Sequence, residues 1–289
     1  SYAERELEAL AVTCAHEFFH VCHYAYGSNP EWLWWMEATA VWSEEQNFPG
    51  IDDYLSYVTS FQNAPEIGMD APSPAIHMYG ACLFPLFLSE NYGRRAIADI
   101  WNRVPDLPVY FSIADFADSL SAPLDSLYGE FARWNLYVGD NYRGFGYPDA
   151  AEMPEPQIVP EDSIYEILPE AMDGGGAAIY LEVSTPGEGG IWGRVNALDS
   201  LSAKFHAVSV PGTDAPDSSV DILGTEDTIP GVWRFERTIA VISNISRTPA
   251  TDAYLAASEP FIYGPATGAS VASPGDDLTL SPYPNPFAY

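Results

Sequence analysis

Positive charge is scarce in this chain. Its 289 residues include 41 acidic and 11 basic side chains, with Lys204 as the single lysine, and the formal net charge is -30. A surface of this sign repels phosphate backbones and anionic lipid, and it favours solubility and cation binding. The charge therefore argues against nucleic acid as a partner and suits a salty or extracellular setting.

Long apolar runs and cysteines are also scarce. No run of about 18 apolar residues exists, so no membrane span is expected. Ser1 opens onto a helical pattern without a basic and apolar leader, so we expect a mature or trimmed chain. Cys14 and Cys22 lie on one predicted helix, roughly 12 Å apart, which is too far for a disulfide. At most Cys82 pairs with one of them, and buried free thiols are the favoured interpretation.

The composition predicts a folded chain whose first part is helical. Hydrophobic residues make up 47% and aromatic residues 14% of the chain, which is enough to bury a sizeable core. The length favours two domains. We place a mainly α-helical domain at residues 1–140, because helical patterns cover residues 3–26, 29–45, 52–61, 75–92, 94–103, 112–120 and 123–137.

The rest of the chain predicts strands. Residues 141–160 are proline-rich and acidic, as linkers are. Short alternating runs then predict a β-sandwich domain at 161–263, followed by a flexible tail at 264–289. The runs lie at 177–183, 190–195, 203–210, 220–223, 231–236, 239–242 and 253–257. The predicted fold class is α+β. Acidic turns at 214–217 and 276–277 could bind calcium, although no EF-hand loop is present.

The motif His16-Glu17-Phe18-Phe19-His20 carries the chemistry. Residues on a helix turn by about 100° each, so His16 and His20 lie about 40° apart on one face and can bind one ion. Glu17 stands beside the first histidine, where its carboxylate can act as the general base on a zinc-bound water. The motif therefore predicts a zinc-binding helix of metallopeptidase type. His23 is expected to be a packing or rim residue.

A catalytic zinc site needs three protein ligands and an open position. The metzincin pattern would place a histidine six residues after His20 and a glycine three residues after it. Tyr26 and His23 occupy these positions, so that pattern is excluded.

The third ligand is predicted to be Glu37. A short hairpin through Gly27–Pro30 would fold a second helix antiparallel to the first and bring Glu37 back over the histidines. Glu44 and Glu45 are the competing candidates, and they could instead form a solvated helix end or support a histidine as its hydrogen-bond partner.

At this point the chain resembles the gluzincin class of zinc metallopeptidases, in which HExxH is followed by a Glu-x-x-Ala segment. Over residues 8–105 it is most similar to secreted bacterial proteins with a His-Glu-Phe-Phe-His motif and a Trp-Met-Glu-Ala-Thr-Ala segment. The resemblance implies a downstream Tyr or His that stabilises the oxyanion, so Tyr79 and then His77 are candidates because either can donate a hydrogen bond. Tyr79 could also merely pack against the zinc helix.

The resemblance also implies a β-sheet upstream of the zinc helix, whose edge strand binds the substrate backbone. Only 15 residues precede His16, so we expect that sheet to be missing from this chain. An N-terminal segment of the same precursor is therefore a candidate partner. Residues 280–287 resemble the start of C-terminal sorting domains of the type IX bacterial secretion route, which implies a secreted or cell-surface protein; a proline-rich linker is the alternative.

Two functions follow from these expectations. The first is a secreted zinc endopeptidase that acts on a protein or peptide substrate, with His16, His20 and Glu37 as ligands and Glu17 as base. The second is a non-catalytic surface or binding protein with a structural metal and a ligand-binding β-sandwich. The complete zinc motif favours the first, and the missing upstream sheet favours the second.

Overall fold

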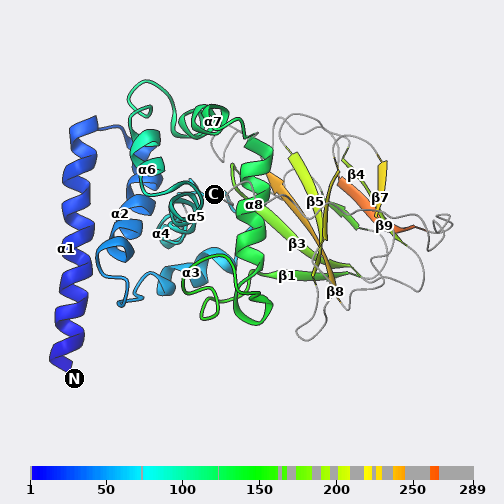
Figure 1. Ribbon diagram of the computed structural model, residues 1–289, viewed down its shortest axis with the longest axis horizontal. Coiled ribbons are helices and arrows are strands. Elements are labelled where there is room, and N and C mark those ends of the chain that lie inside the picture. Colours follow the sequence, from blue (N-terminus) through cyan, green and yellow to red (C-terminus); the bar gives the residue numbers. More distant parts are fainter. Residues whose placement is uncertain are drawn as a thin grey trace.

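Helices occupy one side of the molecule and strands the other, with a long helix between them (Figure 1). The computed structural model describes residues 2–72, 74–122, 124–161, 165–167, 174–183, 190–195, 201–208, 218–222, 226–229, 237–244 and 261–266. The predicted division into a helical first part and a strand-containing second part is confirmed in this coarse form.

The helical part begins with two long helices and continues with shorter ones. Its elements are α1 (Tyr2–Tyr26), η1 (Pro30–Trp32), α2 (Leu33–Asn47), α3 (Leu55–Gln62), α4 (Ile76–Gly80), α5 (Leu83–Tyr92), α6 (Arg95–Trp101), α7 (Val109–Ser119), α8 (Leu124–Leu136) and η2 (Gly139–Asn141). The single helix predicted over 75–92 is wrong, because α4 ends at Gly80 and α5 begins at Leu83. Pro85 explains the break: it has no N–H to continue α4, and it is tolerated in the first turn of a new helix.

A tight connection folds α2 back along α1 (Figure 1). Gly27 has φ of 135°, a conformation that favours glycine. The Asn29 side chain then accepts a hydrogen bond from the Glu31 N–H, and Pro30 starts the 3-10 turn that leads into α2. This local chemistry produces the antiparallel hairpin that the sequence predicts.

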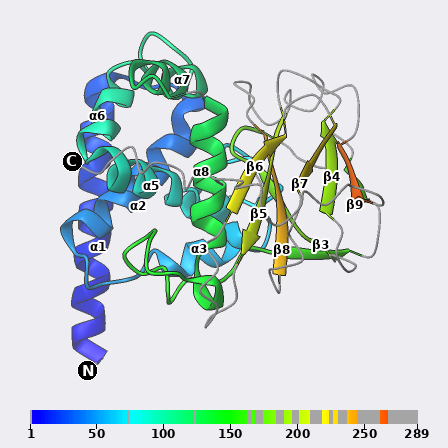
Figure 2. The same cartoon turned by 45° about the vertical axis from the view of Figure 1, so that its right-hand side comes forward.

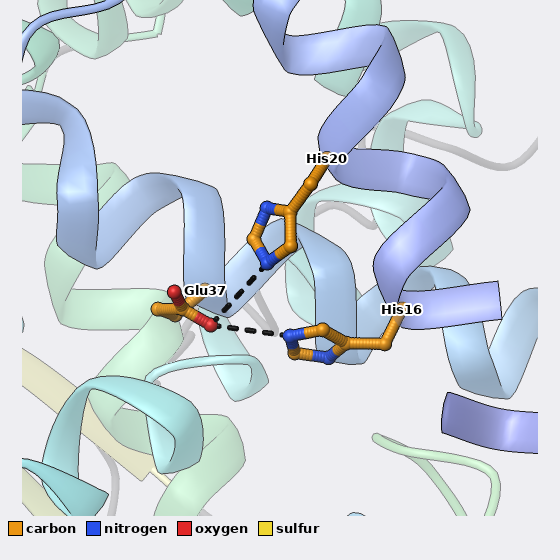
Figure 3. Close-up of side chains that lie close together, drawn as sticks. All are labelled: His16, His20 and Glu37. Carbon is orange, nitrogen blue, oxygen red and sulfur yellow. Dashed lines mark hydrogen bonds and ion pairs between the residues drawn. The ribbon is translucent and has the colours of Figure 1, made fainter. Parts of the chain in front are cut away.

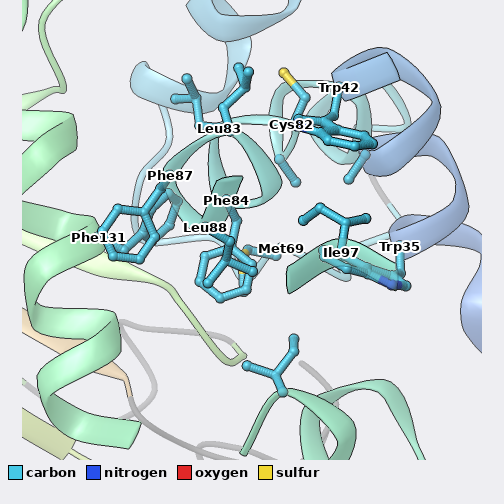
Figure 4. Close-up of a cluster of buried hydrophobic side chains, with 14 of the residues drawn as sticks. Trp35, Trp42, Met69, Cys82, Leu83, Phe84, Phe87, Leu88, Ile97 and Phe131 are labelled. Carbon is cyan, nitrogen blue, oxygen red and sulfur yellow. The ribbon is translucent and has the colours of Figure 1, made fainter. Parts of the chain in front are cut away.

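The main core lies between α2 and α8. Large side chains from α2, α5 and α8 interlock there, including Trp35, Phe84, Phe87 and Phe131, which are all 1% exposed or less (Figure 4). Edge-to-face contacts between rings, such as that of Phe84 with Phe131 at a centroid distance of 5.0 Å, fix their positions. Helix α2 is therefore held on the core side by packing, while α1 covers its outer side.

The strands form two sheets. They are β1 (Ile158–Glu161), β2 (Tyr165–Ile167), β3 (Ala178–Val183), β4 (Gly190–Val195), β5 (Leu201–Val208), β6 (Ser218–Ile222), β7 (Glu226–Ile229), β8 (Arg237–Asn244) and β9 (Phe261–Ala266). One sheet has the order β1-β3-β8-β5-β6 and the other the order β2-β9-β4-β7. Within them only β1 and β3 are parallel.

Helix α8 packs against the first sheet, as the turned view makes clear (Figure 2). The Tyr180 hydroxyl on β3 donates a hydrogen bond of 2.9 Å to the Ala132 carbonyl on α8. Strand β1 begins at Ile158, inside the predicted linker, and the Gln157 N–H donates to the Gln62 carbonyl. Residues 141–157 are thus attached to the helical part by hydrogen bonds and by buried Tyr147.

Several predictions fall outside the described residues. These are the strands at 231–236 and 253–257, the acidic turns at 214–217 and 276–277, and the sorting segment at 280–287. The β-sandwich and the domain limits stay predictions. Strand β9 covers 264–266, which were assigned to the tail. None of the helices that the structure describes is long and apolar enough to cross a membrane.

The cysteine prediction is right for one residue and wrong for two. All three cysteines are free, and Cys82 is buried as expected, but Cys14 and Cys22 are exposed on α1. The reason is that the described part of the chain covers α1 along one side, so apolar residues on its other side are exposed there.

Candidate metal centre

Helices α1 and α2 bring His16, His20 and Glu37 together (Figure 3). The Glu37 Oε2 atom lies 3.2 Å from His16 Nε2 and 3.6 Å from His20 Nε2. The two imidazole rings meet edge to face with centroids 4.8 Å apart. Each of the three side chains is between 13% and 15% exposed, so the group is mostly buried but still reaches solvent.

The donor set and its spacing fit a zinc ion. Two imidazole nitrogens and one carboxylate oxygen are the ligands of one known type of catalytic zinc site. Ligand atoms about 2.0 to 2.2 Å from a tetrahedral zinc would be about 3.3 to 3.6 Å apart, close to the two distances between Glu37 and the histidines. All three ligand atoms lie within 4.8 Å of one another. The geometry admits one metal ion.

Glu44 supports His16 from behind. Its Oε1 atom lies 2.6 Å from His16 Nδ1, so His16 Nδ1–H donates to a carboxylate and Nε2 is left to face Glu37. Burial opposes the charged form of His16, but the hydrogen bonds to Glu37 and Glu44 outweigh it and raise the pKa of His16 to about 9. Without a metal, the protonated His16 ring therefore donates one hydrogen bond to Glu44 and one to Glu37.

A second chain of hydrogen bonds supports His20. The Thr39 hydroxyl donates to the Trp35 carbonyl at 2.7 Å, so its oxygen accepts from His23 Nε2–H at 2.9 Å. His23 Nδ1 is then an acceptor, and His20 Nδ1–H donates to it at 3.1 Å. Because His20 Nδ1 carries the proton, the lone pair for a metal is on His20 Nε2, the nitrogen that faces Glu37.

His23 can only play this part as a neutral ring. Burial, and then the positive charges of His20 and His16, lower the pKa of His23 to about 3. The ring is 1% exposed and stacks on Trp101 with centroids 4.5 Å apart. The prediction of a packing residue is confirmed, but the hydrogen bond from His20 is a role that the sequence reasoning missed. Its signal was the position of His23 three residues after His20 on the same helix.

The structure also places the two predicted catalytic residues Glu17 and Tyr79. Glu17 is exposed on α1, beside His16. The Tyr79 ring on α4 stacks over the His16 ring with centroids 6.1 Å apart. Burial, followed by the negative charge of Glu37, a hydrogen bond to Glu37 and the charge of Glu17, raises the pKa of Tyr79. Its hydroxyl therefore keeps its proton near the carboxylates.

The structure does not bring His77 to this group. His77 is completely buried, stacks on Phe61 with centroids 4.8 Å apart, and places Nε2 3.2 Å from the Ile67 carbonyl. Burial lowers its pKa to about 4. Helical residues two positions apart point in nearly opposite directions, since each residue turns by about 100°. The His77 ring therefore points into the core, whereas Tyr79 points toward His16.

Glu44 and Glu45, the competing ligand candidates, are both 5% exposed, so the alternative of a solvated helix end is wrong. Glu44 supports His16, whereas Glu45 belongs to a different acidic group with Asp52 and Asp149.

No family model, no curated protein and no solved structure matches this chain.

Proposed function

We propose that the chain is a zinc-dependent peptidase whose metal ligands are His16, His20 and Glu37. The observation that carries the proposal is the convergence of these three ligand atoms within 4.8 Å. The exposed carboxylate of Glu17 beside His16 supports it, as does the separate hydrogen-bond partner behind each histidine. Such partners fix the imidazole orientation and are typical of metal-binding histidines.

The number of ligands favours a catalytic metal over a structural one. Structural zinc sites are closed by four protein ligands, whereas catalytic sites have three and keep one position open. The group found among the described residues has three members, and each is partly exposed. This argues against the alternative of a non-catalytic binding protein with a structural metal.

The residues around the ligands divide the work of peptide hydrolysis. A bound zinc ion would polarise the scissile carbonyl and acidify a water molecule. Glu17 would take the proton of the attacking water and pass it to the leaving amine. Tyr79, held in its protonated form, would donate a hydrogen bond to the oxygen that becomes negative. Glu44 and His23 would hold the two histidines in the tautomers that bind metal.

The wider proposal is a secreted or cell-surface bacterial endopeptidase of gluzincin type. The HExxH motif, the Glu37 segment and the net charge of -30 support this assignment. In this proposal the strands belong to a β-sandwich, and an N-terminal segment of the same precursor completes the groove for a protein or peptide substrate. His77 has no part in it, because its ring is buried against Phe61.

The test is cleavage of an unfolded protein by the zinc-loaded chain and by Glu17→Gln. We expect the variant to retain one zinc per chain and to lose about 10²- to 10⁴-fold in cleavage rate, the contribution of a general base. The matched control is Glu8→Gln, an exposed glutamate on the same helix, which should cleave normally. Retained cleavage by Glu17→Gln would refute the role of the base.

Tyr79→Phe tests the oxyanion role separately. Removing the hydroxyl keeps the ring that stacks on His16, so zinc content should not change. We expect kcat to fall by about 10²-fold, as for loss of one oxyanion donor, with little change in KM. If the chain binds zinc but never cleaves a peptide library, with or without a co-expressed upstream segment, the non-catalytic alternative is the better one.

A further inference from the structure

A second acidic group lies at the C-terminal end of α2. Glu45 is in the last turn of that helix, Asp52 is in the connection to α3, and Asp149 is in the segment that follows α8. One oxygen from each lies within 4.8 Å of the others. Three separate segments of the chain therefore place carboxylates around one point.

The burial of Glu45 is what sets this group apart from an ordinary acidic surface. Glu45 is 5% exposed, and its Oε2 atom is buried without a hydrogen-bond partner. A buried unpaired carboxylate oxygen is costly, and native proteins normally satisfy it with a partner, water or an ion. None of the ion pairs formed by the described residues involves Glu45, Asp52 or Asp149.

The surroundings bring further negative charge instead of a counter-charge. Burial, followed by the charges of Asp149 and Asp52, raises the pKa of Glu45 to about 7. Asp149 Oδ2 accepts a hydrogen bond of 2.8 Å from the Tyr54 hydroxyl, which fixes this carboxylate and leaves its other oxygen for a ligand.

We propose that Glu45, Asp52 and Asp149 form a calcium site that ties the C-terminal end of α2 to the segment after α8. Calcium takes oxygen ligands at 2.3–2.6 Å, so two of its ligands can be up to about 5 Å apart, and it accepts irregular geometry. Magnesium needs shorter, near-octahedral bonds and retains its water molecules, so it fits this spacing less well. The site is independent of the proposed peptidase function.

Such a site would strengthen the attachment of residues 139–153 to the helical part. This stretch is attached to the helical part by the Gly139 N–H to Ala150 carbonyl hydrogen bond and by buried Tyr147 and Met153. A cation shared by α2, the α2–α3 connection and this stretch would neutralise three carboxylates at once. It would also secure the helix that carries Glu37.

The experiment measures the melting temperature of the full chain, with stoichiometric zinc at pH 8, as calcium chloride is added. Saturation at 100 times Kd should raise the melting temperature by about 5 °C, and magnesium should do much less. Asp52→Asn, which alters an exposed side chain, should remove most of the shift and weaken calcium binding at least tenfold in calorimetry. The control Glu152→Gln, an exposed glutamate in the same segment, should respond like the unaltered chain.

Glu45→Gln provides a second, opposite signature. Because it removes a buried charge among like charges, it should melt higher than the unaltered chain without calcium, yet gain nothing from calcium. If the unaltered chain shows no calcium shift, or if both variants keep the full shift, the proposed site is wrong. An equal response to magnesium would overturn the choice of calcium.

Discussion

Helices α1 and α2 lie side by side and share the candidate metal centre, but they are held very differently. Most of α2 is buried, and Trp35 in its first turn is 0% exposed. On α1, by contrast, Leu10 is 58% and Phe18 is 70% exposed. The core thus fixes Glu37 and its neighbours on α2, whereas the histidines sit on a helix anchored along one side. Helix α2 therefore sets the geometry to which α1 must fit.

The largest effect that tests this contrast is expected for Trp35→Ala on α2. The substitution removes a buried indole that stacks on Trp101 and meets Phe84 edge to face. We expect the free energy of unfolding to fall by about 3–5 kcal/mol, measured by denaturant titration of the metal-free chain. A loss below 1 kcal/mol would show that α2 is not fixed by the core.

The next effect is expected for Glu44→Gln, which acts from α2 on α1. The amide keeps the shape of the side chain but removes the charge that faces His16 Nδ1–H at 2.6 Å. Zinc affinity should fall about 10- to 100-fold, measured by competition with a chelating dye. Glu31→Gln, an exposed glutamate before α2, serves as the control, and an equal loss in both variants would remove Glu44 from the site.

Thr39→Val should have a smaller effect on zinc, because it acts through two hydrogen bonds. Without the hydroxyl oxygen, His23 Nε2–H loses its acceptor, and the tautomer of His20 is no longer fixed. We expect about tenfold weaker zinc binding, at the low end for residues behind a ligand. Thr59→Val on the exposed side of α3 is the control. Unchanged affinity would mean that His23 and Thr39 only pack.

The smallest effect is expected for Leu10→Ala on α1. Its side chain is 58% exposed, so the free energy of unfolding should change by no more than about 0.5 kcal/mol, in the same titration as Trp35→Ala. A loss of 2 kcal/mol or more would indicate that another part of the chain or a second molecule covers this side of α1.

The sequence predicted the parts of the site that depend on local geometry. The helical period placed His16 and His20 on one face, and the Gly27–Pro30 connection predicted the hairpin that brings Glu37 over them. No local pattern indicated that Thr39 would accept a hydrogen bond from His23, because that bond depends on how closely α2 packs against α1.

Contacts between distant segments were out of reach for the same reason. The group of Glu45, Asp52 and Asp149 joins residues about a hundred positions apart, and Asp149 lies in the predicted linker. The exposure of Cys14 and Cys22 likewise depends on which side of α1 the rest of the chain covers. Periodicity identifies an apolar helix, but not the neighbours it will have.

The X-ray absorption spectrum of the zinc-loaded chain at the zinc edge reports directly on binding of the ion by His16, His20 and Glu37. We expect one zinc with two imidazole rings and further oxygen ligands at about 2.0–2.2 Å, and no sulfur. The His20→Ala variant should lose one imidazole. A zinc–sulfur distance of about 2.3 Å, which would place the ion on Cys14 or Cys22, or an unchanged spectrum in His20→Ala, would contradict this assignment.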